Sequence, residues 1–569
     1  MTRLRARGPH KLTLNVDLLR KTVFEMAERV KEKIKQEARG RMMSLMMDIA
    51  SKHHRSIFGV SIQFIVNSEI KIRTIMMEKI LTRHTAENLA KMLKKIFDAY
   101  DIPLCNVFAI NSDNGRNMLA TTNELDELAL TNSDEWFDSG IASSLISMIE
   151  QEDRSEMLAQ IAQDVYNNEN IVPFNYQYIT AVRCGSHTYQ RAVEAAWNSS
   201  KCIDTGVKLI DVISSARSVV KELRTGTWLL YLEESGVPIP AIDNITRWFS
   251  IHIMLFSLLK CKQFILDKAE EIRVLEEKGE KIDKTKKMKN VLTEFEWKVI
   301  EEAVDVMHPA YELMKKMQTN SFTLSEFYST WTLIKISMRR HATKSNLLTD
   351  LSTEMQKNML NYEPRLFMNP LLLCCLYLDP RVSGVLEQTD DQGTQRKAVA
   401  KSEVTKVYQR LKQQNIEPEI PIPNNNRFSR FVDLETDFDL YIESLHRNPS
   451  SIEQNSNREV SLAADLLTLE LECIEYEKEK RLPLRSNVLQ FWELNKKKYP
   501  TLFSVSQVIM AVPSSQTSIE RCFSSFGFIY SNSRTLLSAE IMQAILLIRA
   551  NADVFEDVAS DKLVEAAAL

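Results

Sequence analysis

The sequence predicts an α/β core interrupted by a large all-helical region, and three observations lead to this fold class. Between residues 44 and 113 the pattern runs strand, strand, strand, helix, strand. From about residue 120 to 370 the apolar residues recur at helical spacing, with no rhythm of strands and turns. The 569 residues include only 13 Gly and 16 Pro, so residues that break helices are scarce.

The predicted strands are short apolar stretches separated by polar turns, and the predicted helix lies between the third and the fourth. In order, these elements are Ser44–Asp48, Ile57–Val66, Ile70–Met77, the helix Ala86–Tyr100, and Asn106–Ile110. This order is the one expected of a ribonuclease-H-like core. Residues 385–460 contain polar and Pro/Asn-rich stretches, so flexible loops are expected there.

The charge balance restricts how the chain could bind nucleic acid. Lys and Arg number 72 and Asp and Glu 76, which gives a net charge of −4, so binding would depend on a local basic patch. Residues 1–40 hold eleven Lys/Arg and five Asp/Glu, and from Leu14 they predict a basic amphipathic helix. This helix either covers a sheet edge with solvated lysines or contacts phosphates.

The eight cysteines form no CxxC pair and no disulfide-framework spacing, so we expect free thiols in a reducing compartment and no zinc finger. The apolar run Leu371–Leu378 is far shorter than the ~20 residues that span a bilayer. We therefore expect neither secretion nor membrane insertion.

Two aspartates follow apolar strands of the predicted core. Asp48 ends one stretch and Asp113 follows another, so both carboxylates are expected at one edge of the same sheet. Two such carboxylates can bind a divalent cation, and a third would complete a two-metal site for phosphoryl transfer. The alternative is that each aspartate only forms a turn or caps a helix.

A C-terminal motif adds the third acid. Residues 513–527 read PSSQTSIERCFSSFG, and Arg534, Leu536, Leu537 and an apolar run ending near Asn551 follow. This segment closely resembles the C-terminal signature of the hAT superfamily of transposases. The resemblance implies that Glu520 is the third catalytic acid. It also implies that the helix bearing Ile541, Ile545, Leu547 and Ile548 builds a homodimer or higher oligomer.

Further elements resemble the family in the same order along the chain. Asp48 and Asp113 match the first two catalytic aspartates, and Cys184 and His187 match a Cys-x-x-His element that would position the active site. Arg247 and Trp248 match a Thr-Arg-Trp element that would hold a phosphate and stack on an exposed base. The remaining matches are Leu378–Arg381, Phe491-Trp492 and Tyr499-Pro500. Cys184 and His187 could instead be structural, and Trp248 could be part of a helical core.

The resemblance implies the following organisation. A ribonuclease-H-like core is built from residues 41–190 and 485–552, and an all-helical insertion, residues 191–484, interrupts it. A basic segment, 1–40, precedes the core, and a tail, 553–569, follows it. Asp48, Asp113 and Glu520 would hold Mg²⁺ or Mn²⁺ for cut-and-paste cleavage of DNA in the nucleus, leaving hairpins on the flanking DNA.

A non-catalytic alternative stays open. The chain could be a nuclear, DNA-associated regulatory dimer derived from a transposase. Two departures favour it: Ala50 stands where family members commonly carry Trp, and no BED-type zinc finger precedes residue 40. Ile519 also replaces the Ser that usually precedes the third acid.

Overall fold

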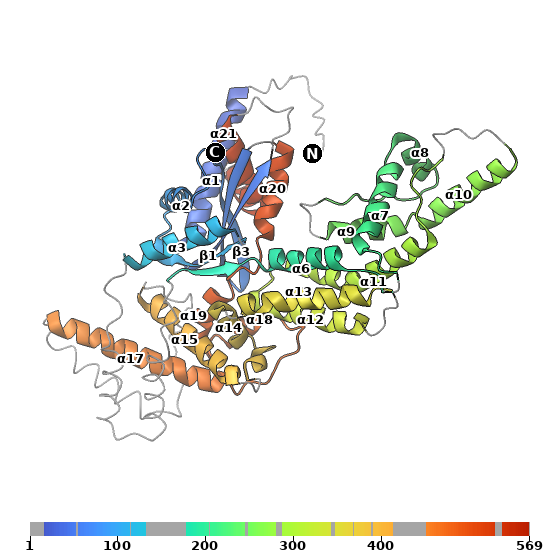
Figure 1. Ribbon diagram of the computed structural model, residues 1–569. Helices are drawn as coiled ribbons and strands as arrows, with labels where there is room; N and C mark the ends of the chain where they lie inside the picture. Colours follow the sequence, from blue (N-terminus) through green and yellow to red (C-terminus); the bar gives the residue numbers. More distant parts are fainter. Residues whose placement is uncertain are drawn as a thin grey trace.

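The computed structural model describes most of the chain (Figure 1). The described residues are 16–52, 55–113, 115–131, 178–203, 205–244, 249–279, 287–342, 347–367, 369–387, 391–413, 451–529 and 538–567. They form one mixed sheet, helices on both of its faces, and an extended helical region to one side.

The sheet has five strands in the order β3-β2-β1-β4-β5. Their bounds are β1 (Met43–Lys52), β2 (Arg55–Val66), β3 (Glu69–Lys79), β4 (Val107–Ser112) and β5 (Thr180–Arg183). The first three strands are antiparallel neighbours, whereas β4 runs parallel to β1 and β5 runs parallel to β4. The four predicted strands are confirmed, and β5 is an addition to the prediction because four residues are too few to show alternation.

One face of the sheet is covered by helices close to it in sequence and by the C-terminal helix. These are α1 (Val16–Ala38), α2 (Ala86–Ala99), α3 (Arg116–Thr131) and α22 (Ala552–Ala567). Helix α1 buries Met26, Val30 and Ile34, whereas Lys21 is exposed and its other lysines are half-buried, so the predicted amphipathic helix is confirmed as a covering helix. Helix α22 buries Val554 and Val558 in the same core, so residues 553–567 are not a separate tail.

The other face carries a second core, built by helices from the later part of the chain. These are α14 (Pro370–Tyr377), η2 (Ser383–Glu387), α15 (Asp391–Gln413), α17 (Ser451–Tyr476), α18 (Val488–Asn495) and α19 (Pro500–Ile509). The expectation of flexible loops over residues 385–460 is wrong for α15 and the start of α17. Val404, Val407 and Leu411 give α15 a buried face, which outweighs its polar first turns. Residues 414–450 lie outside the described residues.

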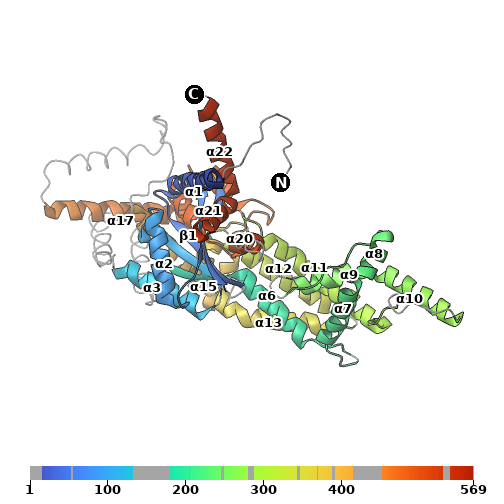
Figure 2. The same cartoon turned by 90° about the horizontal axis from the view of Figure 1, so that it is seen from above.

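The predicted all-helical region forms its own core beside the sheet (Figure 2). Its helices are α6 (Gly185–Ser199), α7 (Leu209–Leu223), α8 (Gly226–Glu234), α9 (Ser250–Leu259), α10 (Lys262–Glu277), α11 (Glu294–Met317), α12 (Leu324–Ala342) and α13 (Thr349–Phe367). Trp197 and Trp331 are fully buried at its centre. Charged α10 extends outward, as its sequence indicates.

A buried ion pair joins the helical region to the second core. Asp379 and Arg381 are both buried, and the Arg381 guanidinium donates to the Asp379 carboxylate at 2.6 Å. Asp379 also accepts from the Ser325 hydroxyl on α12 at 2.6 Å, and Arg381 donates to the Glu326 carboxylate at 3.0 Å. The turn that resembles the family's Leu-Asp-Pro-Arg element therefore connects α12 to the chain after α14.

Removing the Asp379 charge should destabilise the protein. Asp379→Asn leaves the Arg381 guanidinium buried with Glu326 as its other carboxylate partner, so we expect a loss of about 3 kcal/mol in the free energy of unfolding. Urea denaturation measures it. Glu270→Gln on exposed α10 is the matched control, with an expected change below about 0.5 kcal/mol. Equal stability of the two variants would contradict this role.

Candidate active site

The C-terminal segment Ala511–Gln516 lies against the central strands β2, β1 and β4. The Gln63 side chain on β2 donates to the Ala511 carbonyl at 3.0 Å, and Asn111 on β4 donates to the Pro513 carbonyl at 2.8 Å. The Gln516 side-chain amide donates to the Met47 carbonyl on β1. These bonds attach a segment more than 400 residues away in sequence to three neighbouring strands.

Helix α20 (Thr517–Ile529) begins directly after this segment and packs on β1 and β2. It approaches β2 closely at Gly59, where a Cβ atom would lie 2.9 Å from the Ile519 side chain and 3.0 Å from Phe523. Ile519, which replaces the family's usual Ser, is fully buried in this contact. A side chain larger than glycine at position 59 would displace α20 and the acid that it carries.

The register of the sheet places Asp48 beside Asp113. Met47 on β1 pairs with Ser112 on parallel β4, and the next residue on each strand is an aspartate. Asp48 does not end its strand as predicted, because β1 continues to Lys52 and pairs with β2. Glu520 lies in the first turn of α20, which packs on these strands.

The three carboxylates interact electrostatically. Burial and the neighbouring Asp113 charge raise the pKa of Asp48 from an ordinary 3.8 to about 7. Burial and the Asp48 charge raise the pKa of Glu520 from 4.5 to about 8. The Oε1 atom of Glu520 is buried without a hydrogen-bond partner. Asp48 is therefore close enough to Asp113 and to Glu520 for the charges to interact.

Cys184 and His187 lie beside these acids. Cys184 is buried at the N-terminus of α6, and its amide donates to the Ser112 carbonyl at 2.9 Å. Burial raises the pKa of the Cys184 thiol to about 12, which suits a structural thiol rather than a metal ligand. The His187 Nε2 atom lies 3.6 Å from the Glu520 Oε1 atom, and burial lowers the pKa of His187. His187 is thus a neutral neighbour of Glu520.

Gln516 belongs to the candidate site, although the sequence analysis assigned it no function. It lies one helical turn before Glu520, and its side chain hydrogen-bonds the strand that carries Asp48. A polar side chain four residues before a candidate acid lies on the same helix face, and this spacing is the sequence signal that could have identified Gln516. Gln516 links β1 to the start of α20.

The predicted DNA contacts Arg247 and Trp248 lie outside the described residues. Phe249, which follows them, is buried and stacks on Tyr189 in the helical core, with ring centroids 5.7 Å apart. Its amide donates to the Gln190 side chain of α6 at 3.2 Å. The chain directly after the Thr-Arg-Trp element is therefore anchored to the helix that also carries His187.

Comparison with known families identifies the C-terminal part. Residues 470–552 match the hAT family C-terminal dimerisation region. The match supports an hAT-family transposase or a protein derived from one. The match covers the end of α17 and all of α18 to α21 (Ala539–Ala550), including Glu520, and supports self-association of the chain. No curated protein matches the chain.

The predicted dimer residues lie on α21, which packs on β3 and α1. Ile541 is buried, and Ile545, Leu547 and Ile548 are half-buried. Its own chain therefore covers part of this face of α21. The adjoining α1 exposes Val16, Leu18 and Leu19, each more than half accessible, so the chain also has exposed apolar side chains on this helix.

Among the described helices, none is long and apolar enough to cross a membrane.

Metal-free protein should lose stability as pH rises, because Asp48 and Glu520 have higher pKa values folded than unfolded. Folding then favours their protonated forms; the stabilisation is complete below about pH 4 and is lost as pH passes through 7 and 8. We expect the free energy of unfolding in EDTA to fall by several kcal/mol between pH 5 and 9, because each acid that is protonated only in the folded state costs about 1.4 kcal/mol per pH unit. Glu520→Gln should roughly halve this slope, whereas Glu271→Gln on α10 should preserve it. An unchanged slope in Glu520→Gln would contradict the buried-acid assignment.

Self-association should depend on α21. Leu547→Asp adds a charge to a half-buried apolar position in the dimerisation region, so we expect the dimer to dissociate at micromolar concentration in sedimentation velocity. Leu230→Asp, at an exposed position on distant α8, is the matched control and should leave the dimer intact. Circular dichroism verifies that both variants fold. If the wild type sediments as a monomer, or if Leu547→Asp sediments as a dimer, α21 does not form the interface.

Proposed function

We propose that the chain is an hAT-type DNA transposase, or a protein derived from one, with a metal-dependent site for phosphodiester cleavage and strand transfer at Asp48, Asp113 and Glu520. The observation that carries the proposal is the position of Asp48, which interacts with Asp113 on the neighbouring strand and with Glu520 from 472 residues further along the chain. The nucleus, where chromosomal DNA lies, is the proposed location.

The sheet supports a ribonuclease-H-like core for this function. Three antiparallel strands are followed by a helix and by a fourth strand parallel to the first, in the order β3-β2-β1-β4-β5. Asp48 on β1 and Asp113, directly after β4, lie side by side on this parallel pair. Helix α20, which packs on β1 and β2, carries Glu520 in its first turn.

The three carboxylates have the chemistry that a divalent cation requires. Carboxylate oxygens are the ligands that Mg²⁺ and Mn²⁺ prefer, and the raised pKa values and the unpartnered Glu520 oxygen indicate a deficit of positive charge. As the side chains lie, no group of three or more His, Cys, Asp or Glu in the described part of the chain could hold a metal. Bound ions would therefore require the carboxylates to draw together.

Asp48, Asp113 and Glu520 would hold the cation, which would activate water or a 3′-hydroxyl and neutralise the charge that develops on the phosphate. The other residues position these acids. Gln516 fixes the start of α20 to β1, and neutral His187 packs beside Glu520 without neutralising it. DNA would be oriented by basic side chains outside the acid cluster.

A non-catalytic DNA-associated dimer is the second candidate. The observation that favours it is the lack, among the described residues, of three ligands already grouped for a metal. In such a protein the same fold and dimerisation region would serve DNA binding or regulation, and the acids would be indifferent to metal.

Metal binding separates the two candidates. Mn²⁺ that binds only the folded state should stabilise it by about 2.7 kcal/mol at a hundredfold excess over its Kd. Glu520→Gln or Asp113→Asn should weaken this stabilisation, and at about pH 9, where Glu520 is ionised, Glu520→Gln should raise the metal-free melting temperature because it removes a repelling charge. Differential scanning fluorimetry with and without Mn²⁺ measures both effects, with Glu271→Gln as control.

Cleavage assays complete the test. Wild-type protein should nick DNA in the presence of Mn²⁺, and Asp48→Asn, Asp113→Asn and Glu520→Gln should each abolish nicking while still binding DNA. A wild type that neither gains stability from Mn²⁺ nor cleaves would support the non-catalytic dimer.

A further inference from the structure

A pocket of about 240 Å³ adjoins the acid cluster at the start of α3. Its described lining consists of Ile49, Asp113 and residues 115–118. Asp113 and Arg116 are the charged residues of this lining, one of each sign. We propose that this Arg116 pocket binds a phosphate of the DNA strand that Asp113 helps to cleave, and that the Arg116 guanidinium holds the phosphate. The inference rests on the proposed DNA function.

The lining places the Arg116 pocket beside both aspartates of the candidate site. Ile49 follows Asp48 on β1, and its amide donates to the Asp48 carboxylate at 2.8 Å. Asp113 directly follows β4, which pairs with β1. A ligand in the pocket would therefore contact Asp113 and the neighbour of Asp48, where a strand bound for cleavage has to pass.

The backbone that carries Arg116 is fixed on both sides. On one side, the Gly115 amide donates to the Asp113 carboxylate at 2.9 Å, and a Cβ atom at position 115 would lie 2.8 Å from the same oxygen. On the other side, the Asn117 side chain donates to the His84 carbonyl at 2.7 Å. The turn between β4 and α3 therefore needs little ordering when a ligand binds.

The Arg116 side chain is available to a ligand. It is exposed, and no residue in the described part of the chain forms an ion pair or a hydrogen bond with it. Asp113 lies in the same pocket, but its carboxylate accepts from the Gly115 amide instead. The positive charge of Arg116 is thus not used to hold the fold together.

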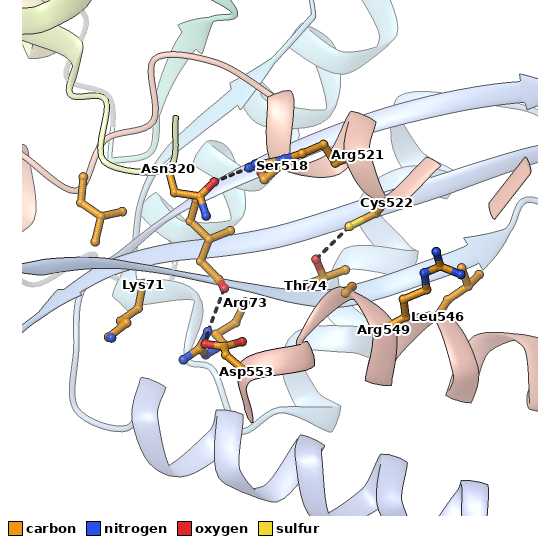
Figure 3. Close-up of a pocket in the computed structure, with 13 residues that line it drawn as sticks. Lys71, Arg73, Thr74, Asn320, Ser518, Arg521, Cys522, Leu546, Arg549 and Asp553 are labelled. Carbon is orange, nitrogen blue, oxygen red and sulfur yellow. Dashed lines mark hydrogen bonds and ion pairs between the residues drawn. The ribbon is translucent and has the colours of Figure 1, made fainter. Parts of the chain in front are cut away.

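A larger pocket on the other side of the sheet shows the opposite arrangement (Figure 3). It has a volume of about 460 Å³, and Arg73 on β3 is part of its lining. The Arg73 guanidinium donates to Glu37 on α1 at 2.6 Å and to Asp553 on α22 at 2.9 Å. Arg73 therefore holds two helices on the sheet, whereas Arg116 has no such structural task.

Size and lining favour a phosphate group over a base. The volume is below the ~300–1,000 Å³ of pockets that enclose a whole drug-sized ligand, so it suits a phosphate rather than a complete nucleotide. No aromatic side chain is among the described residues of the Arg116 pocket, so a base would find no stacking partner. Arginine binds phosphate with paired donors and without reading sequence.

Salt-dependent DNA binding tests the Arg116 pocket. In fluorescence anisotropy in EDTA, we expect full-length Arg116→Gln to bind a duplex of about 30 base pairs roughly fivefold more weakly than the wild type at about 100 mM salt. The slope of log affinity against log salt should become shallower by about 1, because one phosphate contact is lost. Arg116→Lys retains the charge and should retain the slope.

Arg339→Gln is the matched control. Arg339 lies in the last turn of α12, is exposed, and forms no ion pair or hydrogen bond with any residue that the structure describes. Its substitution changes the net charge by the same amount and should leave the slope unchanged. Circular dichroism verifies that all variants fold.

Cleavage kinetics give a second measurement. A residue that holds the phosphate equally before and during the reaction contributes to KM and not to kcat. With Mn²⁺, Arg116→Gln should therefore raise the KM for DNA nicking roughly fivefold and leave kcat within about twofold of the wild type.

Three outcomes would overturn the inference. One is wild-type affinity and slope in Arg116→Gln. Another is an equal loss in Arg339→Gln, since the effect would then come from net charge and not from this pocket. The third is that inorganic phosphate raises the melting temperature of the wild type and not of Arg116→Gln while both bind DNA alike, because the ligand would then be a free anion.

Binding and cleavage are measured separately, so the two proposals can fail independently. If the wild type cleaves DNA with Mn²⁺ and Arg116→Gln binds DNA like the wild type, only the phosphate-binding role of Arg116 is wrong. If the wild type never cleaves but Arg116→Gln loses affinity and slope, Arg116 holds a DNA phosphate and the catalytic proposal fails.

Discussion

Hydrogen bonding of Ala511–Gln516 to the central strands is the constraint on which the rest of the structure depends. Gln63, Asn111 and Gln516 supply buried side-chain amides that satisfy carbonyls across this junction. Leaving such groups unpaired in the interior would cost about 1–3 kcal/mol each, so the junction is specific in register as well as favourable. Because α20 begins directly after it, the junction sets the position of Glu520 on one side of that helix and of Arg521 on the other.

The junction also explains how the fold tolerates mutually repelling acids. Asp48 and Glu520 are held near each other by apolar packing of α20 on Gly59 and by the Gln516 bond, neither of which involves their charges. Burial and a neighbouring carboxylate raise the pKa of each acid. A fold stabilised elsewhere can hold such a site ready for a cation, whereas the same acids would spread apart if they alone determined the local geometry.

Sequence reasoning could predict the strands and the pairing of Asp48 with Asp113, because parallel neighbouring strands present their carboxyl ends together. Periodicity could not show that Glu520 lies near Asp48, because the spacing of apolar residues does not reveal which distant helix packs on a sheet. That prediction came from the resemblance of the C-terminal motif. Short β5 escaped prediction because four residues show no period, and α15 escaped because its first turns are polar although Val404 and Leu411 are buried.

The placement of the helical region follows from the same constraint. Loop-closure entropy grows only with the logarithm of loop length, so inserting hundreds of residues between β5 and α20 adds little to the cost of bringing Glu520 to Asp48. The helical region is nevertheless attached to the rest of the fold. The backbone amides of Cys184 and Gly185, at its start, donate to the carbonyls of Ser112 and Ser514, each at 2.9 Å. Asn320, within the region, accepts a hydrogen bond from Arg521. It is therefore attached to β4, to the segment before α20 and to α20 itself. A shift of the helical region on DNA would therefore move the surroundings of the acid cluster.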